Sequence, residues 1–158
     1  MSEAVVGPPS AGSGAALAKR PSVLKGTGVV VLDFEPIINL LKNMTEETAR
    51  TIPTPTGYRV LVAMPSVKQK TAGGIDLPAT MTAREETATV ACIVVDLGTD
   101  TYKDTRKFPS GPYCKPGDIV MIRAYSGTRF KIGDIEFRYV NDDSIEGVVE
   151  DPSEIQRL

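Results

Sequence analysis

The sequence predicts a mostly β protein, a small barrel or sandwich with two long loops, preceded by a flexible arm and a short helix. Three observations support this prediction. Short apolar segments recur after residue 57 with glycine or proline turns between them, which is typical of small barrels and sandwiches. Glycine and proline are frequent, with 14 and 12 residues among 158. The 41% hydrophobic and 24% charged residues lie near the globular average, so one packed core is expected.

The first 28 residues are rich in glycine, alanine, proline and serine, a composition that buries too little apolar area to fold alone. We therefore expect a flexible arm there, and residues 29–32 could add a short strand. Two prolines stiffen residues 51–56 into an extended form, which places a domain boundary there. The predicted organisation is an N-terminal extension at residues 1–56, a β domain at 57–151 and a tail at 152–158.

A helix near residues 34–44 is predicted within the extension. Apolar residues recur there at steps of three and four, which places them on one helix face, namely Phe34, Ile37, Ile38, Leu41 and Met44. Asp33 is the expected N-cap, and Pro36 fits the first turn, where its missing donor would be unpaired anyway. A helix this short needs a surface to pack on, either on its own domain or on a neighbouring subunit or partner.

Six segments of the β domain have the composition of strands and end in turn residues. They are residues 58–64, 87–97, 118–123, 128–132, 135–140 and 144–150. Gly133 and Asp134 lie between the fourth and fifth segments, and this pair predicts a hairpin. The two long loops are residues 65–86 and 98–117, and loops of this length in a compact domain are usually functional or disordered.

The first loop begins with polar residues and then contains an apolar pair. Its informative part is the run Gly73, Gly74, Ile75, Asp76, Leu77 and Pro78. In an extended chain Ile75 and Leu77 face the same way, which suits docking into an apolar groove of another protein. The alternative is that both side chains fold back on the domain.

Composition excludes several classes of function. The chain has no histidine, which removes Ser-His-Asp and Cys-His catalysis and histidine metal sites. No other motif in the sequence restores such chemistry, so no enzyme and no metal are expected. The net charge of -2 without a basic cluster argues against nucleic acid as a partner. No apolar run is long enough to span a membrane. Cys92 and Cys114 are expected to be structural thiols in a reducing cytosol.

Several motifs in register resemble GroES-type co-chaperonins. Residues 70–78, Lys-Thr-Ala-Gly-Gly-Ile-Asp-Leu-Pro, are similar to the mobile loop of that family. Three further segments are similar to its Lys-x-Gly-Asp-x-Val turn, its Tyr-x-Gly-Thr-x-x-Lys-Ile stretch, and its acidic turn with the closing strand, at residues 115–120, 125–132 and 141–150. Residues 58–62 lie where the family has its first strand. The resemblance covers roughly residues 57–151.

The resemblance implies a GroES-like partial β-barrel that assembles into a homo-heptameric dome. It implies that loop residues 73–78 bind a GroEL-type chaperonin, so that the dome closes the protein-folding chamber, with ATP on the chaperonin and no cofactor on this chain. The residues 98–117 would correspond to the hairpin that roofs the dome. A closing strand would pair with the first strand of the next subunit, through Arg59, Val60, Leu61, Val148, Val149 and Glu150.

Two features depart from the family pattern. Asp76 stands where the family usually has an apolar residue, and burying its carboxylate unpaired would be costly. The long N-terminal extension is unlike the housekeeping form and resembles bacteriophage-encoded members. The alternative is therefore a GroES fold reused as a phage virion structural or assembly component, with the helix near 34–44 anchored on a neighbour. We expect a cytoplasmic protein, in the host cytoplasm if a phage encodes it.

Overall fold

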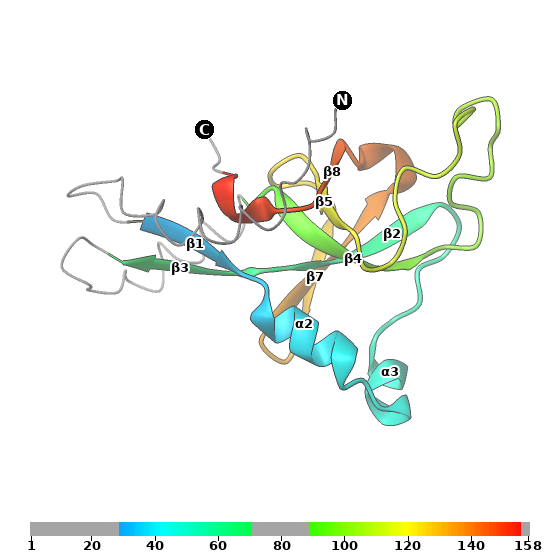
Figure 1. Ribbon diagram of the computed structural model, residues 1–158. Coiled ribbons are helices and arrows are strands. Elements are labelled where there is room, and N and C mark those ends of the chain that lie inside the picture. Colours follow the sequence, from blue (N-terminus) through cyan, green and yellow to red (C-terminus); the bar gives the residue numbers. More distant parts are fainter. Residues whose placement is uncertain (1–28, 71–88, 156–158) are drawn as a thin grey trace, which may run out of the picture.

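A computed structural model describes residues 29–70 and 89–155, which form two antiparallel sheets (Figure 1). The large sheet has six strands in the order β6-β7-β2-β4-β5-β8, and the small sheet consists of β1 and β3. Within the large sheet, β6 and β8 form the two ends and do not pair with each other. The prediction of a mostly β, GroES-like partial barrel is confirmed, and the barrel is not closed.

The centre of the large sheet consists of β2 (Arg59–Met64), β4 (Ala91–Leu97) and β7 (Ile135–Asn141). The strands nearer the ends are shorter, namely β5 (Ile119–Met121), β6 (Thr128–Ile132) and β8 (Gly147–Val149). All six predicted strands are therefore present. The strands β4, β5 and β8 are shorter than the segments that the sequence predicted for them.

The strands β6 and β7 form the predicted hairpin. Ile132 pairs with Ile135 across the turn, and Gly133 has a φ of +61°, a conformation that glycine adopts without steric cost. Farther along the hairpin, Phe130 pairs with Phe137 and their rings stack with centroids 5.6 Å apart. The turn residues and the alternating flanks thus identified this hairpin correctly.

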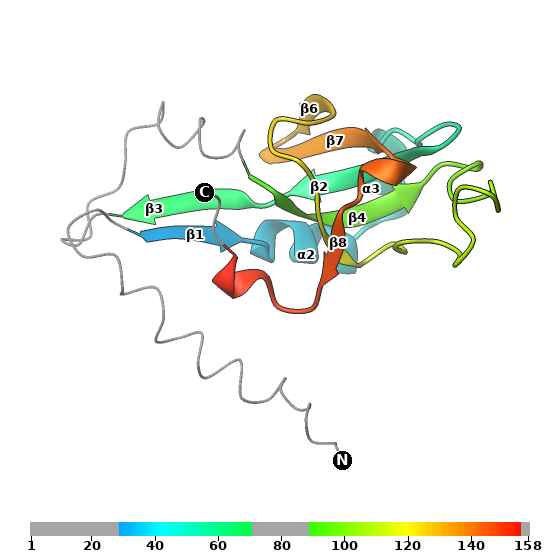
Figure 2. The ribbon, with the colours of Figure 1, turned by 90° about the horizontal axis from the view of Figure 1, so that it is seen from above.

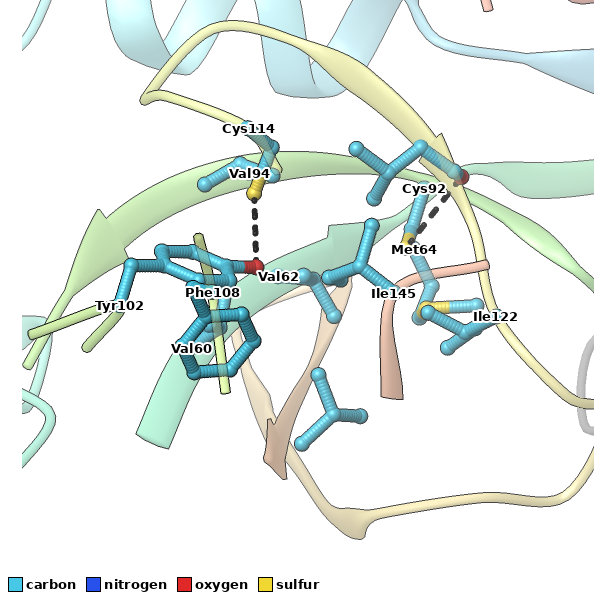
Figure 3. Packing of buried hydrophobic residues seen from close by; sticks show 12 residues of the cluster. Val60, Val62, Met64, Cys92, Val94, Tyr102, Phe108, Cys114, Ile122 and Ile145 are labelled. Carbon is cyan, nitrogen blue, oxygen red and sulfur yellow. Dashed lines mark hydrogen bonds between the residues drawn. The ribbon is translucent and has the colours of Figure 1, made fainter. Parts of the chain in front are cut away.

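The large sheet buries side chains on both of its faces. On one face, which we call the loop face, Val60, Val62 and Met64 of β2 lie in the same apolar cluster as buried residues of the 98–117 segment (Figure 3). On the opposite face, the helix face, Leu61 and Ala63 lie in a second apolar cluster. Because successive strand residues point to opposite faces, burial on both faces explains why β2 is an uninterrupted apolar run.

The helix face is covered by α2 (Glu35–Lys42), which lies under the large sheet in Figure 1. Ile37 is buried in the same cluster as Leu61 and Phe137, and Ile38 and Leu41 are half-buried beside it. The helix therefore packs on its own domain, which decides between the two alternatives that its apolar spacing left open.

The predicted N-cap of this helix is wrong by one residue. Phe34 occupies the cap position without a side-chain capping bond, although Asp33 Oδ1 accepts a hydrogen bond from the Glu35 backbone N–H at 3.0 Å. Asp33 is still the last residue of β1 (Val29–Asp33), where it is paired with Ser66. The first hydrogen bond of the helix runs from the Ile38 N–H to the Phe34 backbone oxygen at 3.0 Å, so the helix begins one residue later than its acidic signal indicates. The predicted place of Pro36 in the first turn is confirmed.

A second short helix, α3 (Glu46–Thr51), was not predicted. Thr45 is its N-cap, and its Oγ1 accepts a hydrogen bond from the Thr48 N–H at 3.1 Å. No residue of α3 is buried, so the segment has no apolar periodicity to detect. The available signal was local, a threonine followed by Glu46 and Glu47, which is typical of a helix start.

The first predicted loop begins later than expected. Residues Ser66–Lys70 form β3, which pairs antiparallel with β1 from Val29↔Lys70 to Asp33↔Ser66. The assignment of residues 66–70 to a loop is therefore wrong. The segment is polar and its partner strand comes from the distant N-terminal extension, so local composition carried no sign of the pairing. The short strand expected at residues 29–32 is confirmed.

Residues 98–117 contain turns and no helix or strand, and they pack on the loop face. Tyr102, Phe108 and Cys114 from this segment are buried, and the Tyr102 and Phe108 rings meet edge to face with centroids 4.8 Å apart. Tyr102 adopts a left-handed φ of 59°. Its N–H donates to Asp142 Oδ2 at 3.1 Å and its hydroxyl donates to Asp142 O at 2.8 Å, which fixes the segment to the domain.

Candidate functional site

The predicted partner-binding residues lie outside the described residues. They are Gly73, Gly74, Ile75, Asp76, Leu77 and Pro78. The structure does place the chain on both sides of them. β1 and β3 extend as a ribbon beyond the large sheet in both views (Figures 1 and 2), so Lys70 lies at the far end of the ribbon, whereas Thr89 is buried in the domain just before β4.

One open edge of the large sheet is formed by β8. It pairs with β5, for example through Ile119↔Val149, and no described strand pairs with its other side. Val148 is 53% exposed. An edge strand offers free backbone groups to another chain. The predicted interface residues Val148, Val149 and Glu150 therefore lie where a second subunit can reach them.

The predicted partner segment of that interface lies elsewhere. Val60 pairs with Leu97 of β4 on one side and with Val140 of β7 on the other. Leu61 is likewise paired on both sides, and both side chains are fully buried. A strand with both sides paired has no free ladder groups, so this topology does not allow Val60 and Leu61 to pair with a neighbouring closing strand. Arg59 is exposed at the start of the same strand.

A charge cluster lies on the loop face of β7 and was not predicted. Glu136 Oε2 accepts hydrogen bonds from Arg138 Nε at 2.7 Å and from Arg129 Nε at 3.0 Å. Burial alone raises the pKa of Glu136, but the hydrogen bonds from Arg129 and Arg138 outweigh it and hold the pKa below its usual value. Charged residues that alternate along a strand are typical of a solvent-facing side, which is why the sequence pattern did not reveal this buried cluster.

The two cysteines are free thiols buried on the loop face. Burial raises the pKa of both the Cys92 and the Cys114 thiol, so neither supplies an appreciable thiolate at neutral pH. Cys114 Sγ lies 3.5 Å from the Tyr102 hydroxyl, and a dashed line marks this contact in Figure 3. This geometry supports the predicted structural role of both thiols in packing.

A surface hollow of about 400 Å³ lies beside residues 98–117. Its lining is mostly acidic and polar, with Tyr58, Asp100, Asp104, Lys107, Phe108, Asn141, Asp142 and Asp143. Lys107 Nζ pairs with Asp143 Oδ2 at 2.7 Å, so part of the acidic charge is neutralised within the chain. Across residues 29–70 and 89–155, no cluster of metal-ligating side chains is found, and no helix is long and apolar enough to cross a membrane.

Comparison with known proteins accounts for the large sheet. The family model described as "Chaperonin 10 Kd subunit" matches residues 53–149. The chain is 36% identical over 96 residues to "Co-chaperonin GroES" of Geobacter sulfurreducens, which covers 61% of this chain and 96% of that protein. It is 32% identical over 97 residues to "Co-chaperonin GroES" of Rubrobacter xylanophilus, with the same coverage of 61% and 96%. The match contains all six strands of the large sheet and leaves β1, α2 and α3 outside.

Proposed function

Because this chain belongs to the Chaperonin 10 Kd subunit family, we propose that it is a co-chaperonin, a lid that closes the folding chamber of a GroEL-type chaperonin ring. The observation that carries the proposal is the family match across residues 53–149, which contains the complete large sheet. The relatives named as co-chaperonins are matched over 96% of their own length, so the resemblance concerns whole proteins and not a shared fragment.

In this proposal, Ile75 and Leu77 make the contact with the chaperonin ring. Their alternate spacing directs both side chains to one side of an extended segment, which suits an apolar groove. Asp76 then points to the opposite side. An extended binding mode therefore keeps its carboxylate in water while its two neighbours are buried, and avoids the cost of an unpaired buried charge.

We place seven such subunits in one ring. The open edge at β8 and the exposed Val148 support contact between subunits, with a partner segment other than the central strand β2. Seven weak contacts that are linked by one ring bind far more tightly than a single contact. Each contact alone stays weak, so the lid remains releasable.

The proposed role is binding and enclosure, without a chemical step on this chain. ATP binding and hydrolysis belong to the chaperonin, whose cycle controls when the lid is bound. With such a partner, we expect the chain in the cytoplasm, which is the host cytoplasm if a phage encodes the protein.

The test is co-migration of the protein with a GroEL-type ring on a sizing column in the presence of ATP. Wild-type protein should elute with the ring, and an Ile75→Ser, Leu77→Ser variant should elute alone because it has lost both apolar side chains. An Ile75→Val, Leu77→Met variant is the matched control, since it keeps both positions apolar, and it should bind. Wild-type protein that binds no ring but is found in virions would support the virion component instead.

A further inference from the structure

The ribbon of β1 and β3 carries the chain to the proposed chaperonin-binding residues. β3 follows β2 after a single residue, Pro65, and continues beyond the large sheet to Lys70 (Figures 1 and 2). The family match begins at residue 53. It therefore contains β3 but not β1, so this chain supplies the partner of β3 from its own N-terminal extension.

The pairing covers the whole of β3. All five of its residues have a partner in β1, from Asp33↔Ser66 at the base to Val29↔Lys70 at the tip. Among the described strands, β3 pairs with β1 alone. A single strand in water does not offset the conformational entropy that is lost on ordering it. The order of β3 beyond the large sheet therefore depends on β1.

The base of the ribbon is anchored through both strands. β3 continues from the central strand β2, and β1 runs into α2, whose Ile37 is only 1% exposed. Pro36 and Ile37 line a small hollow of about 120 Å³ together with Pro65 and Ser66, so the start of the helix lies against the junction of β2 and β3. Val67, the second residue of β3, is buried next to this junction.

The ribbon sets where the predicted binding segment begins. A strand rises about 3.3 Å per residue, so the five residues of β3 carry the chain roughly 16 Å beyond the large sheet. The chain then passes into residues 71–88 and returns at Thr89, which is buried in the domain. Without β1, the residues of β3 would themselves have to be ordered when the chaperonin binds.

We propose that β1 is a built-in template strand that strengthens the chaperonin contact by ordering β3 before binding. Ordering five residues in advance removes their entropic cost from the binding step. The resulting gain in affinity is multiplied if several subunits of one ring bind at once. This inference rests on the proposed function, and it assigns a role in that function to residues 29–33, which lie outside the family match.

The test breaks the ladder and leaves the rest of the domain in place. Consecutive residues of an antiparallel strand alternate in whether they face the partner. A Val30→Pro, Val31→Pro variant therefore removes a ladder donor in either phase. A Val30→Thr, Val31→Thr variant is the matched control, because it keeps both N–H groups and the branched side chains. A Lys68→Pro, Gln69→Pro variant breaks the same two pairs from β3.

Two measurements test the inference. One is amide hydrogen exchange at residues 66, 67 and 70 of β3, which keep their N–H groups in every variant, and the other is the affinity for a GroEL-type ring with ATP. Both proline variants should exchange faster and bind the ring at least about tenfold more weakly, while the threonine variant should match wild type. Proline variants that exchange faster yet bind as tightly as wild type would overturn the inference and leave the proposed function intact. Wild-type protein that binds no ring would overturn the proposed function, and this inference with it.

Discussion

The Arg138 side chain is 0% exposed, so its positive charge is buried on the loop face of the sheet. Its Nε lies 2.7 Å from Glu136 Oε2. A Glu136→Gln substitution removes the negative charge and leaves the guanidinium buried. Breaking a buried ion pair in this way costs about 3–5 kcal/mol, so the free energy of unfolding should fall by that amount in urea denaturation. The control is Arg129→Gln, because Arg129 is 45% exposed and should contribute less than about 1 kcal/mol. Equal losses in the two variants would contradict this account.

The same carboxylate predicts how stability depends on pH. The pKa of Glu136 in the folded protein lies below its usual value of 4.5, so the unfolded chain takes up this proton first as the pH falls. The stabilisation is complete above about pH 4.5 and is lost as the pH falls through the lower folded-state pKa. The difference in unfolding free energy between wild type and Glu136→Gln should therefore shrink on acidification. If this difference in unfolding free energy stayed constant down to about pH 3, the lowered pKa of Glu136 would be contradicted.

Residue roles of this kind were the hardest to predict from the sequence. The apolar residues of β2 were identified because their run is long and bounded by turn residues. The burial of Glu136 and Arg138 was not identified, because their partners lie on other segments: Arg129 donates to Glu136, and Ser126 O accepts a hydrogen bond from Arg138. The predicted binding residues Ile75 and Leu77 stood out by their spacing and by the resemblance of residues 70–78 to a mobile loop, and they lie outside the described residues.

At the scale of elements, Gly98 shows how closely the end of β4 approaches the start of β2. A Cβ at this position would collide with the backbone oxygen of Gly57 and would lie 3.0 Å from that of Arg59. A Gly98→Ala substitution should therefore lower the free energy of unfolding by about 1–3 kcal/mol. Gly147→Ala is the matched control, since a Cβ there would meet no atom within 4 Å, and it should change stability by less than about 0.5 kcal/mol. Thermal unfolding of the two variants measures the difference, and equal melting temperatures would refute the close approach.

The helix α2 closes the helix face of the large sheet through one fully buried side chain. Ile37→Ala removes most of that side chain from a packed cluster and should cost about 2–4 kcal/mol in the free energy of unfolding. Asn39→Ala, on the exposed side of the same helix, controls for helix propensity and should be nearly neutral. If Ile37→Ala were as stable as Asn39→Ala in urea, the helix would not be part of the core.

The helix also shows what periodicity can and cannot predict. The spacing of Phe34, Ile37 and Leu41 identified the apolar face correctly. It left open which surface covers that face, because a stripe of apolar residues does not specify its partner. The elements that lacked an apolar pattern, α3 and β3, were missed for the same physical reason. One is solvent-exposed, and the other is held by a strand far away in the sequence.

For the whole molecule, the motifs at residues 115–120, 125–132 and 141–150 predicted the family, and the match across residues 53–149 confirms it. The sequence did not predict which strands lie at the edges of the sheet. β8 is an edge as expected, whereas β2 is central. Edge and centre are set by pairings between distant segments, and a strand has the same local composition in either place.

At this scale, the described part of the N-terminal extension, from residue 29 onward, is part of the folded domain. α2 covers an apolar face of the sheet, and β1 pairs with the strand that leads to the proposed binding residues. The family fold is thus kept intact in the large sheet, while the added segment covers its helix face and pairs with β3.

The central claim is that this protein caps a chaperonin ring, and electron microscopy of the mixture tests it most directly. The protein is combined with a GroEL-type ring and ATP, and side views of the particles are classified. The account predicts a dome seated on the end of the ring, which is absent when the Ile75→Ser, Leu77→Ser variant replaces wild type. Rings that stay uncapped with wild-type protein, at concentrations where a bacterial co-chaperonin GroES caps them, would contradict it.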